Sequence, residues 1–347
     1  MMIASHVRKL AGYVPGEQPR SHNVVKLNTN ENAYPPSPKC AEALRAFDLD
    51  NLRRYCDPDC TELRQAIAEL NGTVPERVFI GNGSDEILSL MARTFVEDDE
   101  SIGSLDPSYS LYKTLAAIRN VKWIGADGGS PDREALARER VSLYIWTNPN
   151  APTGEWTEPA AVAAFAASFP GVLLVDEAYA DFARGNCMAL ATAADNRNLL
   201  VMRTFSKSFS LAGLRVGYCI GPAELIEALV KMKDSYNVDA IAQAVALAAV
   251  KDIGWMRANV GKIVATRRWF TGELVRRGWD VLPSESNFVF ARPPAGTAAA
   301  DVFAALRGRE IFVRYFTGPR TGDRLRITIG TPAQMETLLA ALDAMKQ

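Results

Sequence analysis

The sequence predicts an α/β protein: a large domain with a mostly parallel mixed sheet sandwiched by helices, and a smaller α+β domain. Two observations support this. From residue 78 to about 220, short apolar runs alternate with longer amphipathic stretches, which is the pattern of strands connected by helices. A long helical region over 223–277 then leads to a second set of strands. The length of 347 residues allows about two such domains.

The chain divides into three expected parts. An N-terminal arm over 1–34 packs with the small domain, residues 35–245 form the large domain, and residues 246–347 form the small domain. Prolines and asparagines are dense in the arm and just beyond it, over 26–38, and deny regular structure there.

Two helices are expected before the first strand. The first is short and apolar, from Cys40 to Phe47. The second begins at Glu62, and Thr61 is its expected N-cap because a threonine hydroxyl can accept a backbone N–H bond there.

Seven apolar segments are the expected strands of the large sheet, and helical stretches over 86–95 and 160–169 lie between some of them. In parallel sheets covered by helices, ligands gather at the carboxyl ends of the strands, so site residues are expected where these segments end. The segments are 78–80, 101–105, 121–124, 141–145, 172–175, 199–202 and 216–220.

The small domain is expected to contain three strands and two helices. In the last helix, Thr331 and Gln334 form a capping box and Pro332 occupies the first helical position, so this start is strongly indicated. The expected order is strand 288–290, helix 298–306, strand 311–316, strand 324–329 and the terminal helix.

Composition narrows the possible functions. A formal net charge of −1 gives no basic field for nucleic acid or an anionic membrane. No apolar run is long enough for a signal peptide or a membrane span, which predicts a cytoplasmic protein. Five cysteines without paired CxxC spacing argue against a disulfide framework or a zinc site. His6 and His22 are the only histidines, so a central acid–base group is expected to be a lysine.

Lys207 is the candidate for that lysine. It follows the expected strand 199–202, is flanked by Ser206 and Ser208, and lies eight residues before Arg215. Most loop lysines are solvated surface residues, so the assignment depends on the residues at the other strand ends.

Those strand ends supply complementary chemistry. The small residues Gly83 and Ser84, followed by Asp85, join a strand to a helix start, an arrangement that binds anions through free backbone N–H groups. Asp176 ends a buried strand and needs a partner such as a protonated ring nitrogen. Tyr109 offers a ring for stacking on a flat ligand.

Together these residues describe a planar cationic heterocycle with one phosphate and a carbonyl that a lysine can attack. Ser206 and Arg215 complete the phosphate site, and Lys207 supplies the amine. This is the pattern of pyridoxal 5′-phosphate, which proteins hold by a lysine and an acidic partner of the ring nitrogen. A GxGxxG turn or a P-loop, which would indicate a nucleotide, is absent from the sequence.

The same motifs give the chain a resemblance to a known family. The chain is similar to the fold-type I pyridoxal-phosphate aminotransferases and, among them, to the histidinol-phosphate aminotransferases, whose motifs occur here in the same order. The match spans almost the whole chain and is carried by Tyr13-Val-Pro-Gly, Asn28-Thr-Asn-Glu-Asn, Arg54-Tyr-Cys-Asp-Pro, Gly83-Ser-Asp-Glu, Asp176-Glu-Ala-Tyr, Ser206-Lys-Ser-Phe-Ser-Leu-Ala-Gly-Leu-Arg and Arg324-Leu-Arg-Ile-Thr-Ile-Gly.

The resemblance implies roles around the cofactor. Tyr109 stacks on the cofactor ring, Tyr179 contacts its 3′-oxygen, and Tyr55 reaches the cofactor phosphate of the neighbouring subunit of a homodimer. The family's usual loop has asparagine directly before Pro-Thr-Gly, where this chain has Ala151, so we assign the 3′-oxygen contact to Asn150.

It also implies the reaction, a transamination between histidinol phosphate and 2-oxoglutarate in histidine biosynthesis that gives imidazole acetol phosphate and glutamate. On the substrate side, Arg326 binds the α-carboxylate of glutamate and Arg314 binds the phosphate of histidinol phosphate, with Tyr13 and Asn30 nearby.

Three alternatives remain open at this point. An aromatic amino-acid aminotransferase or a threonine-phosphate decarboxylase shares the cofactor residues. A catalytically silent ligand-binding homologue is the alternative outside enzymes, and the joint presence of Lys207, Asp176 and Arg215 argues against it.

Overall fold

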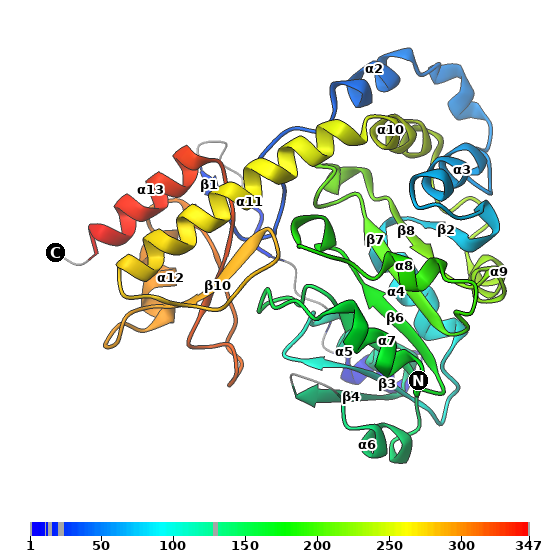
Figure 1. The fold of residues 1–347 in the computed structure, drawn as a ribbon, viewed down its shortest axis with the longest axis horizontal. Helices are drawn as coiled ribbons and strands as arrows, with labels where there is room; N and C mark the ends of the chain where they lie inside the picture. The colour runs from blue at the N-terminus through cyan, green and yellow to red at the C-terminus, as the bar shows by residue number, and fades with distance from the viewer. Residues whose placement is uncertain (1, 11, 13–15, 20–23, 128–130, 346–347) are drawn as a thin grey trace.

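The computed structural model describes residues 2–10, 12, 16–19, 24–127 and 131–345, and it has two units that lie side by side (Figure 1). The larger unit is built on a seven-stranded sheet. Its strands are β2 (Val78–Gly81), β3 (Ser101–Asp106), β4 (Lys122–Asp127), β5 (Val141–Thr147), β6 (Val172–Asp176), β7 (Leu199–Thr204) and β8 (Gly217–Ile220).

The order of strands in this sheet is β2-β8-β7-β6-β5-β3-β4. Strand β8 runs antiparallel to both of its neighbours, and the strands from β7 to β4 are parallel to one another. The mostly parallel mixed sheet is therefore confirmed. Because β3, β5, β6 and β7 point the same way, their carboxyl ends meet along one edge.

Alternating side chains of this sheet feed two separate cores. On β6, Leu173 and Val175 pack on one face and Leu174 packs on the other, and all three are fully buried. Burial on both faces explains why these strands are continuous apolar runs in the sequence.

Helices cover both faces of the large sheet, with α4, α5 and α9 contributing to one core and α3, α7 and α10 to the other (Figure 1). The helices up to the end of this unit are α1 (Ser5–Lys9), α2 (Pro38–Ala46), α3 (Thr61–Leu70), α4 (Gly83–Thr94), α5 (Leu111–Arg119), α6 (Arg133–Arg138), α7 (Pro159–Ala166), α8 (Met188–Thr192), α9 (Ala223–Met232) and α10 (Ala240–Lys251). Short 3₁₀ helices are η1 (Leu49–Arg53), η2 (Pro75–Arg77), η3 (Ala180–Phe182) and η4 (Ala212–Leu214).

The smaller unit has its own core and two small sheets. Its helices are α11 (Ile253–Arg276), α12 (Ala299–Arg307) and α13 (Pro332–Asp343), and its strands are β1 (Val25–Lys26), β9 (Asp280–Val281), β10 (Phe288–Arg292), β11 (Ile311–Phe312), β12 (Arg314–Tyr315) and β13 (Leu325–Thr328). The order of the four-stranded sheet is β12-β13-β10-β9, and the arm strand β1 pairs in parallel with β11.

Three expected elements differ in the structure. The expected strand 311–316 is two strands, because at the buried Val313 the chain leaves β1 and begins to pair with β13. The helical region 223–277 is three helices, α9, α10 and α11. Thr61 is the first residue of α3 rather than its N-cap, and its N–H donates to the carboxylate of Asp57 at 2.7 Å. The capping box of Thr331 and Gln334 is confirmed.

The division of the chain into domains stays a proposal. The expected boundary at 245/246 falls inside α10, where Val245 and Ala246 both pack in a core of the large sheet. Met256 also belongs to that core, whereas Ile263 belongs to the core of the smaller unit. We therefore propose that the large domain extends into α11 and ends between these two residues.

Within the described ranges, none of the helices is both long and apolar enough to cross a membrane.

Candidate active site

A cavity of about 1080 Å³ lies at the carboxyl ends of β3, β5, β6 and β7, and the smaller unit and the N-terminal arm complete its wall. Most of the predicted site residues line it: Asn30, Ser84, Asp85, Tyr109, Asp176, Tyr179, Ser206, Lys207, Arg215, Arg314 and Arg326. The rule that ligands gather where parallel strands end thus located the cavity from the sequence.

Lys207 lies in the loop after β7 and is held from the N-terminal arm. Its Nζ donates to the carbonyl of Thr29 at 3.1 Å, and Asn32 Nδ2 donates to the carbonyls of Lys207 and Ser208, both at 3.0 Å. Burial, followed by the positive charge of Arg326, lowers the pKa of Lys207 to about 8. A larger fraction of this amine is therefore neutral near pH 7 than of an exposed lysine, as nucleophilic attack requires.

Asp176 ends β6 and is only 4% exposed. Its Oδ2 accepts a hydrogen bond from the Tyr112 hydroxyl at 2.7 Å, and its Oδ1 accepts the N–H of Ala178 at 3.0 Å. Burial raises the pKa of Asp176 to about 6, while these two hydrogen bonds favour the ionised form. The carboxylate is thus available to hold a proton on a cationic ligand.

The start of α4, where the sequence predicts an anion cradle, lies against the guanidinium of Arg215. Gly83 has φ +77°, and a Cβ at this position would lie 2.5 Å from Nη2 of Arg215, so a larger residue would displace the guanidinium. Arg215 itself has φ +58° and donates to Ser206 Oγ at 3.3 Å and to Asp85 Oδ2 at 3.2 Å. A cation, a hydroxyl and a helix N-terminus therefore converge on one point, as a phosphate requires.

Two tyrosines frame the space between Lys207 and Asp176. The Tyr179 hydroxyl accepts a hydrogen bond from Asn30 Nδ2 at 2.9 Å, and the Lys207 ammonium lies 5.8 Å from the centroid of the Tyr179 ring. Tyr109 lines the cavity and meets Tyr112 edge to face, with 5.6 Å between the ring centroids.

Arg314 and Arg326 are direct partners across β12 and β13, so both side chains lie on the same face of the small sheet. Each guanidinium carbon is 5.4 Å from the centroid of the Phe316 ring, and Arg326 also donates to the carbonyl of Asn28 at 2.9 Å. The cavity wall opposite the large sheet is therefore strongly cationic.

Asn150 and Tyr55 are not brought to this cavity. Asn150 is not among the lining residues, and its amide nitrogen donates to Pro107 O in the loop after β3 at 2.9 Å and to Thr153 Oγ1 in its own loop at 3.1 Å. Tyr55 is 82% exposed and stacks on Tyr236 outside the cavity. Tyr13 lies outside the described residues.

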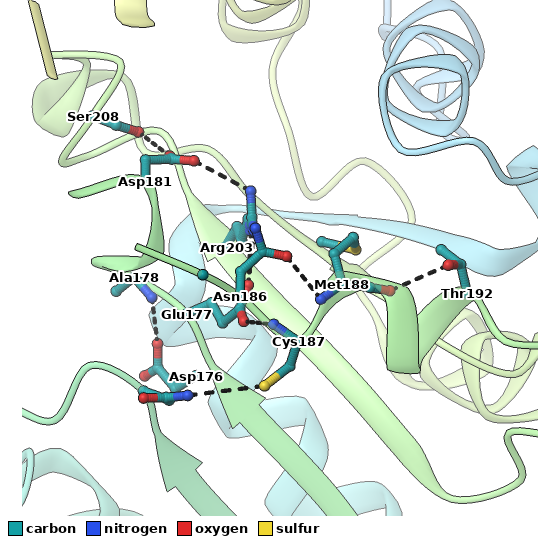
Figure 2. Close-up of polar contacts among 12 residues, drawn as sticks. Asp176, Glu177, Ala178, Asp181, Asn186, Cys187, Met188, Thr192, Arg203 and Ser208 are labelled. Carbon is teal, nitrogen blue, oxygen red and sulfur yellow. Dashed lines mark hydrogen bonds and ion pairs between the residues drawn. The ribbon is translucent and has the colours of Figure 1, made fainter. Parts of the chain in front are cut away.

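A buried ionic network stands behind the site, and Figure 2 shows Arg203 between the carboxylates of Glu177 and Asp181. Arg203 Nη2 is 2.8 Å from Glu177 Oε2, and its Nη1 is 3.2 Å from Asp181 Oδ1. The Ser208 hydroxyl donates to Asp181, and the Cys187 N–H donates to Glu177. Because Glu177 follows Asp176 and Ser208 follows Lys207, the network joins the backbone segments that carry both groups.

The sequence alone does not predict individual site roles for four residues, Thr29, Asn32, Tyr112 and Arg203. Tyr112 lies in the first turn of α5, whereas Tyr109 precedes this helix, so helical spacing does not indicate that the two rings meet edge to face beside the site. Thr29 and Asn32 lie in the arm motif Asn28-Thr-Asn-Glu-Asn, but no periodicity in this motif indicates which of its groups face Lys207.

Comparisons with known proteins agree with this geometry. The family model described as aminotransferase class I and II matches residues 22–342. The chain is 43% identical to the histidinol-phosphate aminotransferase of Geotalea daltonii, covering 98% of each chain. It is 46% identical to histidinol-phosphate aminotransferase 2 of Rhizobium meliloti, covering 97% of each.

Solved structures give the same picture. The crystal structure of histidinol-phosphate aminotransferase from Sinorhizobium meliloti in complex with pyridoxal-5′-phosphate matches with a TM-score of 0.89 and 27% identity, over 98% of this chain and 96% of that one. The structure of L-threonine-O-3-phosphate decarboxylase from Porphyromonas gingivalis matches with a TM-score of 0.81 and 21% identity, over 93% and 99%. The second likeness concerns the fold alone.

Proposed function

Since the chain belongs to the class I and II aminotransferases and, among them, to the histidinol-phosphate aminotransferase family, we propose that it catalyses transamination between histidinol phosphate and 2-oxoglutarate. The products are imidazole acetol phosphate and glutamate, and the reaction belongs to histidine biosynthesis. The observation that carries the proposal is that Lys207, Asp176 and the facing pair Arg314 and Arg326 line one cavity.

Pyridoxal 5′-phosphate is the proposed cofactor, and the residues present fit it. Lys207 would hold it covalently, Arg215 and Ser206 would bind its phosphate at the start of α4, and Asp176 would pair with its ring nitrogen. The approach of Gly83 to Arg215 leaves the cradle free of side-chain bulk, which supports this fit. When bound, the cofactor supplies an electron sink for charge that develops at the substrate α-carbon.

The chain's own groups move and hold the protons. Once released from its covalent link, the Lys207 amine would remove the α-proton in the half-reaction that consumes the amine donor, and as the ammonium it would supply a proton to the α-carbon in the half-reaction that forms the amine product. The pKa of about 8 suits both directions of this transfer near neutral pH. Asp176 holds a proton on the ligand's ring nitrogen, and Tyr179, fixed by Asn30, would orient the ligand's 3′-oxygen.

The two arginines address the problem of two different substrates. Arg326 would bind the α-carboxylate of glutamate, and Arg314 would bind the phosphate of histidinol phosphate. A guanidinium can bind either anion through its planar fork, so the wall need not be rebuilt between half-reactions. Phe316, which both cations contact, would keep them in register.

We also propose that the active form is a homodimer. Tyr55 is 82% exposed, lies outside its own cavity, and belongs to a stretch with Leu49 and Leu52 that exposes 68% and 51% of these side chains. A tyrosine stacked at 4.3 Å on Tyr236 is held ready to reach a neighbouring subunit. Light scattering would measure the mass. Mixing Tyr55→Ala and Lys207→Ala subunits should restore part of the activity if Tyr55 acts across the interface.

A panel of amine donors tests the substrate. The purified, cofactor-loaded protein is mixed with histidinol phosphate, glutamate, phenylalanine and threonine phosphate, and the cofactor absorption band is followed in each half-reaction. We expect the fastest loss of the band with histidinol phosphate and glutamate. Faster reaction with phenylalanine would contradict the proposal, and normal turnover by Lys207→Ala would contradict the whole site.

A decarboxylase acting on threonine phosphate is the second candidate, because a decarboxylase of that substrate has the same fold. Release of carbon dioxide from threonine phosphate distinguishes it, since transamination releases none. A silent binding homologue would leave the absorption band unchanged with every donor.

A further inference from the structure

A row of closely spaced polar side chains runs from Asn150 to Asp176. Ser108 Oγ donates to Asn150 Oδ1 at 2.8 Å and lies 3.1 Å from Thr147 Oγ1. Thr147 Oγ1 is 2.7 Å from the Tyr112 hydroxyl, which in turn is 2.7 Å from Asp176 Oδ2. This row of contacts connects the loops after β3 and β5 to the carboxylate at the end of β6.

The direction of these bonds follows from the donors available. The amide nitrogen of Asn150 donates to Pro107 and Thr153, so its oxygen faces Ser108. The single hydroxyl proton of Ser108 is donated to that oxygen. Tyr112 spends its single proton on the Asp176 carboxylate, which can only accept. Ser108 and Tyr112 can therefore only accept from Thr147, whose single proton can serve one of them. The Tyr112 oxygen, at 2.7 Å, is nearer than Ser108 Oγ, at 3.1 Å, so Thr147 donates to Tyr112. A tyrosine that accepts one such bond donates a stronger one.

Burial makes the last link hard to replace. Tyr112 is 0% exposed and Thr147 is 3% exposed, so the group that donates to Asp176 Oδ2 and the group behind it are both buried. The other oxygen, Oδ1, accepts the Ala178 N–H, and Asp176 also lines the cavity. The carboxylate is thus tied on both sides while it still faces the ligand space.

We infer that Tyr112 is a positioning residue for the reaction: its hydroxyl, aimed by Thr147, keeps Asp176 ionised and fixes the plane of its carboxylate toward the cavity. The inference rests on the proposed function, because the ionised carboxylate is useful where a ligand ring nitrogen must stay protonated.

Other titratable groups act on Asp176 as well. Asp85 from α4 and the neighbouring Glu177 disfavour its ionised form, and Tyr179 lies close enough to feel its charge. Two hydrogen bonds to Asp176 oppose these effects, one from the Ala178 N–H and one from the Tyr112 hydroxyl. Its removal should therefore raise the pKa of Asp176 further.

The chain offers a matched control for this test. Tyr144 on β5 is also 0% exposed, and its buried hydroxyl has no hydrogen-bond partner among the residues that the structure describes. Tyr144→Phe therefore removes the same atom from a buried ring without breaking a bond, whereas Tyr112→Phe breaks the bond to Asp176.

The experiment follows the Asp176 carboxyl carbon by NMR in the full-length, cofactor-free protein labelled with ¹³C-aspartate, with the signal assigned by its loss in Asp176→Asn. We expect Tyr112→Phe to raise the titration midpoint by about one pH unit, the size expected for a hydrogen bond to a charged group. Thr147→Val should shift it less in the same direction, and Tyr144→Phe should leave it unchanged. In the loaded enzyme, the pH below which pyridoxal-phosphate affinity falls should rise with Tyr112→Phe.

An unchanged midpoint in folded Tyr112→Phe would overturn the inference, as would an equal shift in Tyr144→Phe. If circular dichroism shows that Tyr112→Phe does not fold, Thr147→Val decides, and a midpoint equal to that of the unmodified chain overturns the inference. The carboxyl titration needs no substrate, so a failure of the donor panel would leave its result intact and distinguishable.

Discussion

At the scale of single residues, the two groups expected to do the chemistry are both shifted toward their neutral forms by burial. The pKa of Lys207 falls to about 8 and that of Asp176 rises to about 6. Between these values Asp176 is ionised while a growing fraction of Lys207 is neutral. Two residues in one cavity, moved in opposite directions, are a physical sign of acid and base roles.

The pH dependence of cofactor attachment tests the Lys207 shift. A neutral amine is needed for attack, so the rate at which Lys207 of the cofactor-free protein captures pyridoxal phosphate should rise with pH and reach half its maximum near pH 8. Reductive trapping followed by peptide mass spectrometry measures it. Exposed lysines, with an ordinary pKa of about 10.4, serve as internal controls. A Lys207 midpoint that coincides with theirs would contradict the assignment.

Loss of the Arg314 guanidinium should separate the two substrates. We expect Arg314→Ala to lower kcat/KM for histidinol phosphate by about 100-fold, which is about 3 kcal/mol of charge-assisted bonding. For a non-phosphorylated amino acid such as phenylalanine, the loss should stay below about 10-fold. Arg314→Lys keeps the positive charge without the planar guanidinium, so its kcat/KM for histidinol phosphate should lie between that of the unmodified protein and that of Arg314→Ala. Equal losses on both donors would remove Arg314 from the phosphate site.

At the scale of elements, the ionic network shows how strands are fixed to one another behind the site. The side chains of Arg203 on β7 and Glu177 after β6 are 13% and 0% exposed. Breaking a buried pair by removing one partner leaves an uncompensated charge, which costs far more than losing a surface pair.

A stability measurement tests this difference. Arg203→Met should reduce the free energy of unfolding by about 3 to 5 kcal/mol, because Glu177 and Asp181 would lose their shared cation. Arg184 pairs with Glu285 but is 61% exposed, so Arg184→Met should cost less than about 1 kcal/mol. Urea unfolding of the cofactor-free proteins compares them, and similar losses would show that the buried network contributes no special stability.

The elements that the sequence could predict are those determined locally. Period and apolarity located every strand of the large sheet, and the Thr331 capping box fixed the start of α13. The break at Val313 could not be predicted, because it depends on β1, a partner strand far away in the sequence.

The same difference between local and long-range determinants applies to the site. Asp176 and Lys207 follow from the rule of strand ends, whereas the contact of Asn32 with the Lys207 loop depends on how the arm crosses the domain. The resemblance assigns Asn150 to the ligand's 3′-oxygen, whereas in the folded protein its amide nitrogen donates to Pro107 and Thr153, and no local sequence pattern predicts these two contacts.

At the scale of the whole molecule, one side chain of the smaller unit reaches across the cavity to the large sheet. Arg320 lies in the loop between β12 and β13, and neighbouring Phe316 and Thr321 line the cavity. Its Nη1 donates to the carbonyl of Asp106 at 2.7 Å, and its Nη2 pairs with Asp127, so it bridges the ends of β3 and β4. The contact holds the loop over the substrate space.

Removing that bridge should weaken substrate binding more than folding. Arg320 and Asp127 are 46% and 79% exposed, so the pair is worth at most about 1 kcal/mol. We expect Arg320→Ala to raise KM by about two- to fivefold, with little change in melting temperature, and high salt to reduce the difference between the proteins. Arg309→Ala, an exposed change outside the cavity, is the control. A large fall in kcat without a change in KM would argue against a binding role for the bridge.

The pairing of β1 with β11, and of Asn30 with Thr328, has a consequence for the order in which a new chain matures during translation. The strands of the large sheet end at Ile220, so this sheet can assemble while the ribosome is still making the smaller unit. The arm emerges first but finds its strand partners last, since they lie almost 300 residues away. Lys207 can therefore be in place on the large sheet before Asn30 has fixed Tyr179, and the cavity wall that carries Arg314 and Arg326 is the last part of the site to form.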